Sequence, residues 1–217
     1  MTTAAVLFDV DGVLLDSAAA HRRVWDAWSV GRGLDREAVW QLTFGRRPED
    51  TVRDAAPHLD PAGERQVLDR LLHQAGDFPP VEGAGALLSA LPDDRWAIVT
   101  SGDRESVHLR FAAAGLPLPR VQVFAADVKA GKPAPDGFVL AAARLGTAPS
   151  RCLVVEDAPA GVRAGKAAGC TVVGLTTTHA RRALHEADVC VETLAGVRRL
   201  LASHGLLDAP ATERNRG

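Results

Sequence analysis

The sequence predicts an α/β fold in which a parallel sheet forms the core and an all-helical segment interrupts it near the N-terminus. Short apolar runs alternate with helical patterns along most of the chain, which is typical of a parallel sheet covered by helices on both faces. Between about residues 17 and 75 the strand-like runs stop, and apolar residues recur every three to four positions instead. We therefore divide the chain into a catalytic core (1–16 and 81–207), a helical cap (17–80) and a polar tail (208–217) that we expect to be disordered.

The core contains six apolar runs of strand length and three helical patterns. The strands are expected at 4–9, 96–99, 121–124, 152–155, 171–175 and 188–191. The helices are expected at about 103–114, 136–146 and 158–168, each followed or ended by a glycine. Asp136 is interpreted as the N-cap of the second of these helices. The stretch 77–85 is rich in Pro and Gly and marks the return from the cap to the core.

In the cap, glycine and proline separate amphipathic helices. The break Gly31-Arg32-Gly33 ends the first helix, and Pro48 and Pro61 mark later boundaries. The cap holds three of the four tryptophans, which we assign to its apolar core rather than to a sugar-stacking surface; they are Trp25, Trp28 and Trp40.

The composition is that of an ordinary globular protein, with 47% hydrophobic and 24% charged residues. A formal net charge of -2 argues against a general binder of nucleic acid or anionic membranes. The three cysteines are widely spaced in apolar runs, so we expect buried thiols and no disulfide framework. Neither a signal peptide nor a membrane span is visible, and we expect a cytoplasmic monomer or weak homodimer.

Polar residues follow the predicted strands at the points where ligands bind to open parallel sheets. Carboxylates dominate, and a hard divalent cation such as Mg²⁺ relieves their mutual repulsion. Hydroxyls, an ammonium group and loop N–H groups at helix starts are holders of anions. A cation site and an anion site on one rim together predict a phosphate ester bound with Mg²⁺. The segments at the strand ends are Asp9-Val10-Asp11-Gly12, Thr100-Ser101-Gly102 and Glu156-Asp157, and a fourth segment, Gly131-Lys132-Pro133, lies in a loop just before a helix.

These four segments resemble, in order and spacing, the signature of the haloacid dehalogenase-like hydrolase superfamily, whose core is Rossmann-like. A helical insertion just after the first segment is similar to its helical-cap branch. The stretches around Lys132 and from Val155 to Cys170 are especially similar to the glycerol-phosphate, 2-deoxyglucose-6-phosphate and other sugar phosphatases. β-Phosphoglucomutase is a near relative in this branch. The resemblance covers the whole chain except its tail.

The resemblance implies a role for each residue. Asp9 would attack phosphorus and form an aspartyl-phosphate, and Asp11 would act as general acid and then as general base. Thr100 and Lys132 would hold the transferring phosphoryl group, and Ser101 and Gly102 would contribute backbone contacts to it. Mg²⁺ would be held by Asp9, by Asp157 and by the backbone carbonyl of Asp11. Glu156 either reaches the metal through water or orients Lys132.

Two cap residues are candidates for contact with substrate. His21 matches a histidine that contacts the active site in the β-phosphoglucomutase branch, although a helix-surface histidine is the alternative. Arg47, in Gly45-Arg46-Arg47, resembles a cap-loop arginine of the sugar and polyol phosphatases; a solvated arginine is the alternative. We could not assign a role to Phe44.

The predicted function is a Mg²⁺-dependent phosphatase of small sugar or polyol phosphate monoesters. The main alternative is a sugar phosphomutase, which would use the same two aspartates. The cap loop Gly-Arg-Arg-Pro differs from the mutase-like Gly-x-Ser-Arg and favours the phosphatase. Dehalogenase chemistry is disfavoured because Asp11 is present, and a non-enzymatic binding protein is disfavoured because Asp9 and Lys132 are both intact.

Overall fold

The protein contains a six-stranded parallel sheet. The structure, a computed structural model, describes residues 3–207, so the tail predicted to be disordered lies outside the described residues. The strands follow the spatial order β3-β2-β1-β4-β5-β6, and all five neighbouring pairs are parallel. The predicted fold class and the six predicted strands are confirmed. The strands are β1 (Ala5–Phe8), β2 (Trp96–Val99), β3 (Val121–Val123), β4 (Cys152–Glu156), β5 (Thr171–Leu175) and β6 (Val189–Val191).

The first strand occupies the middle of the sheet. Its residues are all buried, and Phe8 is opposite Ile98 on one side and Val155 on the other. The backbone N–H of Asp9 still donates to the Val155 carbonyl at 3.0 Å, so the pairing extends one residue beyond the strand. The carboxyl ends of β1, β2 and β4 therefore lie side by side on one rim.

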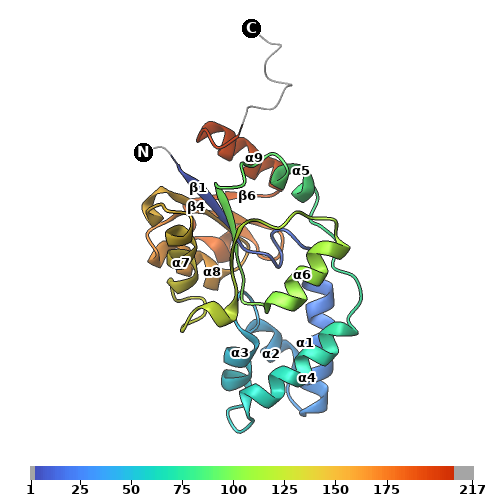
Figure 1. Cartoon of the computed structure of the whole chain (residues 1–217). Coiled ribbons are helices and arrows are strands. Elements are labelled where there is room, and N and C mark those ends of the chain that lie inside the picture. Colours follow the sequence, from blue (N-terminus) through green and yellow to red (C-terminus); the bar gives the residue numbers. More distant parts are fainter. Residues whose placement is uncertain (1–2, 208–217) are drawn as a thin grey trace.

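Helices cover both faces of the sheet (Figure 1). Alternate strand residues point to opposite faces, so Val6 and Phe8 pack in one apolar cluster while Ala5 and Leu7 pack in the other. The first cluster includes residues of α5 (Ala84–Leu88), α6 (Arg104–Ala113) and α9 (Leu194–Ser203). The second includes residues of α7 (Asp136–Arg144) and α8 (Pro159–Ala167). Short 3₁₀ turns complete the core at Ala125–Asp127, Pro149–Arg151 and Arg181–Leu184.

Two details of the core differ from the sequence analysis. The sequence analysis predicts no helix where α9 lies. Its apolar stripe of Leu194, Val197 and Leu201, which begins after the N-cap Thr193, is nevertheless visible in the sequence. Asp136 is the first residue of α7 rather than its N-cap. The residue before it, Pro135, already has helical dihedral angles, and no side chain caps this end. In contrast, Asp103 caps α6 by accepting the N–H of Ser106 at 2.8 Å.

Four helices form the segment between β1 and α5, at the opposite end of the molecule from the termini of the described chain (Figure 1). They share a separate apolar cluster in which Trp28 and Val52 are fully buried. The outgoing and returning chains run side by side, because Asp16 N–H donates to Pro79 O and Val81 N–H donates to Leu14 O. The helices are α1 (Ala18–Gly31), α2 (Arg36–Gln41), α3 (Pro48–Ala55) and α4 (Pro61–His73).

Within residues 3–207, no helix combines the length and the apolar character needed to cross a membrane.

Candidate active site

The site lies where three central strands end. Asp9 follows β1, Thr100 follows β2, and Glu156 is the last residue of β4 with Asp157 directly after it. All four side chains are buried. Because ionised carboxylates are costly to bury without a partner, this arrangement is expected only where something compensates their charge.

Lys132 supplies part of that compensation from the loop before α7. Its Nζ lies 2.5 Å from Asp9 Oδ1 and 2.6 Å from Glu156 Oε1, and it donates to the Val99 carbonyl at 3.1 Å. Burial alone would lower the pKa of Lys132, but the two carboxylates outweigh it and raise the pKa above its ordinary value. The lysine is thus held charged between the two acids.

The carboxylates still exceed the charge that Lys132 can balance. Burial raises the pKa of Asp9 to about 7, although Lys132 opposes the shift. The pKa of Asp157 is raised well above its ordinary value by burial and by the neighbouring Glu156 and Asp9. Two carboxylates whose pKa values are raised side by side indicate a place for a further cation.

The geometry fits such a cation. Asp9, Glu156 and Asp157 each offer one carboxylate oxygen, and these oxygens all lie within 4.8 Å of one another. Asp157 Oδ1 is buried and has no hydrogen-bond partner, which is expensive unless a ligand meets it. A Cβ at Gly12, whose φ is +83°, would lie 2.1 Å from Asp157 Oδ2, so this turn leaves room for the carboxylate only because it is glycine.

Asp11 contacts a different set of groups. Arg110 Nη1 of α6 donates to Asp11 Oδ1 at 2.7 Å, and His21 Nε2 of α1 lies 3.8 Å from the same oxygen. Burial raises the pKa of Asp11, but Arg110 and His21 outweigh burial and lower the pKa below its ordinary value. Arg110 itself stacks on the Phe78 ring.

The remaining predicted site residues fall into two groups. Ser101 Oγ donates to Gly45 O in the cap at 3.0 Å, and Gly102 N–H donates to Thr100 Oγ1 at 3.0 Å. These residues and His21 line one cavity with Asp9 and Asp11. Arg47 does not line that cavity: it donates to the carbonyls of Val128 and Lys129 in the core, at 2.8 and 3.1 Å.

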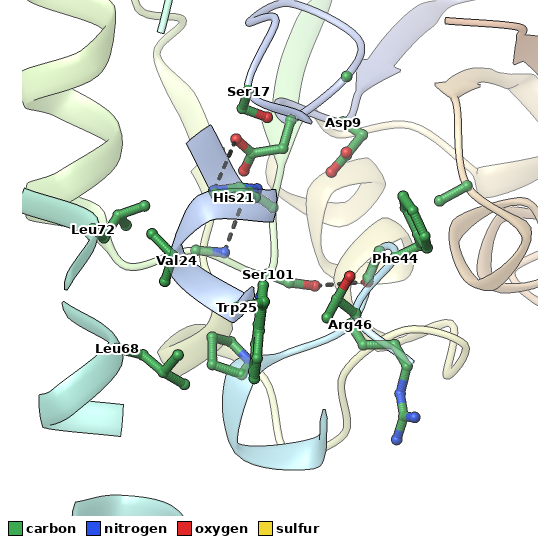
Figure 2. A pocket seen from close by; sticks show the side chains of 18 of the residues that line it. Asp9, Ser17, His21, Val24, Trp25, Phe44, Arg46, Leu68, Leu72 and Ser101 are labelled. Carbon is green, nitrogen blue, oxygen red and sulfur yellow. Dashed lines mark hydrogen bonds and ion pairs between the residues drawn. The ribbon is translucent and has the colours of Figure 1, made fainter. Parts of the chain in front are cut away.

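The cavity lies between the cap and the carboxyl ends of the strands (Figure 2). Val24, Trp25, Leu68 and Leu72 give it an apolar wall on the cap side. Of the three cap tryptophans, only Trp28 belongs solely to the cap core, since Trp25 and Trp40 also line the cavity.

The role of Phe44, which the sequence left open, becomes visible in this cavity. Its ring packs edge-on against His179 of the core, with ring centroids 4.4 Å apart. Phe44 therefore lines the cavity and joins the cap to the core.

Sequence reasoning missed two residues of this site. Thr178 Oγ1 donates to Asp157 Oδ2, and it comes from a run of three threonines just after β5. Polar residues at that strand end were a usable signal, because the strand-end rule applies to β5 as well. Arg110 offered no such signal, since it lies in the last turn of a helix, 99 residues from Asp11 in the sequence.

The fold and the site define a class: α/β proteins with a helical segment over an acid cluster and a buried lysine at the ends of the central parallel strands. The haloacid dehalogenase-like hydrolase model matches residues 3–169, and the chain belongs to this family. This confirms the family that the four sequence segments resemble. Hydrolases of the family generally use a divalent metal, with which the buried acid cluster is consistent.

Individual relatives are similar over most of their length. Hexitol phosphatase A of Escherichia coli is 40% identical over 87% of this chain and 90% of its own. The β-phosphoglucomutase of Mycobacterium bovis is 31% identical over 88% of this chain and 90% of its own. Among solved structures, a hydrolase of the family from Deinococcus radiodurans, with bound phosphate and sodium, has a TM-score of 0.74 at 32% identity, covering 96% of this chain and 99% of its own.

Proposed function

We propose that the protein hydrolyses phosphate monoesters of small sugars or polyols through an aspartyl-phosphate intermediate. The observation that carries the proposal is the buried cluster of Asp9, Lys132, Glu156 and Asp157, of which Asp9 and Asp157 line the cavity beneath the helical segment. A phosphatase of a hexitol phosphate among the relatives supports the same class of substrate.

Asp9 is the proposed nucleophile. Its carboxylate would attack phosphorus in line with the departing alkoxide, forming an acyl phosphate that water then hydrolyses. Lys132, held 2.5 Å from Asp9, would bind the oxygens of the transferring phosphoryl group together with Thr100. Glu156, which is fully buried and paired with Lys132, is assigned the role of orienting the lysine.

Asp11 is the proposed general acid and base. It would give a proton to the leaving alkoxide and later take one from the attacking water. Its position on the cavity wall, with Arg110 and His21 around it, supports this role because the leaving group must lie on the cavity side of phosphorus.

Mg²⁺ is the proposed metal, and Asp9, Asp157 and the backbone carbonyl of Asp11 would hold it. Oxygen-only donors are the set that Mg²⁺ prefers, and Asp157 Oδ1 has no other partner. When bound, the metal shields charge so that a carboxylate can approach a phosphate dianion. Glu156 would influence it only indirectly, because both of its carboxylate oxygens have partners: Lys132 lies against Oε1, and the N–H groups of Asp157 and Ala158 donate to Oε2.

We also propose that residues 17–80 act as a cap over a core made of 1–16 and 81–207. The separate apolar cluster of α1–α4 and the paired outgoing and returning chains support this division. Arg47 would then act in holding the cap against the core loop rather than in direct contact with substrate. A cytoplasmic monomer or weak homodimer remains our prediction, which fractionation and light scattering would check.

The phosphomutase is the weaker alternative. Both activities need Asp9, so the product distinguishes them: release of inorganic phosphate from β-glucose 1-phosphate supports the phosphatase, and formation of glucose 6-phosphate supports the mutase. We expect Asp9→Asn to abolish Mg²⁺-dependent phosphate release, whereas Asp16→Asn, which alters an exposed aspartate nearby, retains it. Full turnover by Asp9→Asn would exclude the proposed nucleophile.

A further inference from the structure

The cavity has a second charged cluster, away from the acids that end the strands. Arg65 of α4 donates from Nε to Asp69 Oδ1 at 2.7 Å and from Nη2 to Asp103 Oδ2 at 3.0 Å. Its Nη1 lies 3.3 Å from Glu49 Oε1. Arg65, Asp69 and Asp103 all line the cavity. This Arg65 cluster therefore lies where the sugar or polyol part of a bound substrate would be.

We propose that the Arg65 cluster is a specificity determinant that accepts hydroxyl-bearing substrates and rejects those with a second anionic group, such as a carboxylate or another phosphate. The inference rests on the proposed phosphatase function and narrows its substrate class. In this proposal, Asp69 and Asp103 determine which phosphate monoesters the protein accepts.

The positive side chains of the cavity lining are already paired. The structure describes three arginines in the cavity lining, and each is already engaged by a carboxylate. Arg65 has three such partners, and Arg110 is paired with Asp11. Arg46 pairs with Asp54 at 2.6 Å, and its guanidinium points away from Asp9 (Figure 2).

Other basic side chains near the site are also engaged. Lys132 lies between Asp9 and Glu156, and His21 faces Asp11. His179 packs against Phe44, and its Nδ1 lies 3.0 Å from the Asp157 carbonyl oxygen. In the described part of the cavity, therefore, the single place built for an anion is the one beside Lys132. A second anionic group on the substrate would have no matching cation to bind.

The Arg65 cluster carries an excess of negative charge. One guanidinium is surrounded by the carboxylates of Asp69, Asp103 and Glu49, so the formal charge of the cluster is negative. The carboxylates of Asp69 and Asp103 are each 40% exposed, so they have lone pairs free to accept hydrogen bonds from hydroxyls. An anion at the same place would be repelled, and like-charge contacts of this kind are a common means of excluding wrong ligands.

Matched substrate pairs test the inference. Sorbitol 6-phosphate and 6-phosphogluconate share a six-carbon skeleton and differ in a hydroxymethyl or a carboxylate at the far end. Glycerol 3-phosphate and 3-phosphoglycerate form the same pair on three carbons. We expect kcat/KM to be at least about 30-fold higher for the hydroxymethyl member of a pair. Equal values within a pair would overturn the inference while leaving the phosphatase function intact.

Hydrolysis of p-nitrophenyl phosphate, lost in Asp9→Asn, tests the proposed function separately. If no phosphate monoester is hydrolysed, the proposed function is wrong and this inference fails with it.

A charge-neutralising variant tests the residues themselves. Asp69→Asn keeps the side-chain shape and removes one negative charge, so we expect the preference for hydroxymethyl over carboxylate substrates to fall about 5- to 10-fold. Asp94→Asn is the matched control, because it neutralises an exposed aspartate that lies outside the cavity lining and should leave the preference unchanged. A ratio of kcat/KM values does not depend on the fraction of folded enzyme. An equal effect of both variants, or no effect of Asp69→Asn, would refute the assignment.

Discussion

Gly161 is the position where the smallest substitution should disturb the site most. It is buried in α8, and a Cβ added there would lie 1.8 Å from Glu156 Oε1 and 2.3 Å from Oε2. Glu156 is completely buried and is held by Lys132 at 2.6 Å and by the N–H groups of Asp157 and Ala158. Gly161→Ala therefore forces the carboxylate out of the place where it orients the lysine.

The size of the effect follows from three contributions. Reaching an ordinary contact distance requires the carboxylate to move by roughly 1.5 Å, and overpacking of this kind costs about 1–3 kcal/mol. Weakening a buried charge-assisted contact between Glu156 and Lys132 costs about 1.5–3 kcal/mol more. The higher helix propensity of alanine returns about 1 kcal/mol. We expect a net loss of about 1.5–5 kcal/mol in the free energy of unfolding, or roughly 3–20 °C in Tm.

Thermal unfolding followed by circular dichroism measures the stability, and phosphate release from sorbitol 6-phosphate measures the activity. Gly31→Ala is the matched control, because Gly31 also lies in a helix but no atom lies within 4 Å of its added Cβ. That variant should stay within about 0.5 kcal/mol of the wild type or gain slightly. If the two glycine variants have the same Tm and the same kcat, the packing of Glu156 against α8 does not support the site in the way described.

Three further outcomes are expected. Arg110→Ala should lower kcat for sorbitol 6-phosphate by about 10- to 100-fold because it releases Asp11. Hydrolysis of p-nitrophenyl phosphate should fall less, because its leaving group needs no proton and only the later activation of water depends on Asp11. Arg110→Lys should partly restore the loss, and an equal fall for both substrates would contradict a role of Arg110 in the general-acid step. Thr178→Val should weaken Mg²⁺ binding by about 10- to 100-fold, because Asp157 loses its hydrogen bond from Thr178. Calorimetry measures the affinity, and an unchanged affinity would contradict this role of Thr178. In EDTA, the wild type should lose stability relative to Asp9→Asn as pH rises from about 4 to 7, by up to about 4 kcal/mol. The reason is that the raised pKa of Asp9 means that the folded chain holds a proton that the unfolded chain releases. A difference that does not change over that range, or no gain in wild-type stability on adding Mg²⁺ at pH 7, would oppose it.

The strand-end residues were predictable because they depend on a local pattern and one rule of topology. A buried run followed by acids marks a strand end, and parallel strands bring their carboxyl ends to one rim. Asp9, Thr100 and Asp157 are brought together in this way. Lys132 was harder, since it stands in a loop before a helix rather than at a strand end. Its charge suggested a place in the anion site, and the resemblance of its segment to a known family strengthened that prediction.

The cap was predicted as helices but not as a surface. Helical spacing shows which residues are apolar, and it does not show whether an apolar residue faces other helices or the cavity. Trp25 and Trp28 are three residues apart and share one cluster, yet only Trp25 lines the cavity. Adjacent arginines show the same limit, because Arg46 lines the cavity while Arg47 contacts the carbonyls of the core loop.

The sequence by itself thus determined the sheet, the helical insertion and the acids at the strand ends, because these follow from periodicity and from the direction of parallel strands. Only the tertiary structure decided which charges are paired. Arg110 reaches Asp11 from 99 residues away, and Arg65 joins α4 to Asp103 at the start of α6. Such pairs depend on how separate elements pack against one another, and sequence spacing carries no information about that distance.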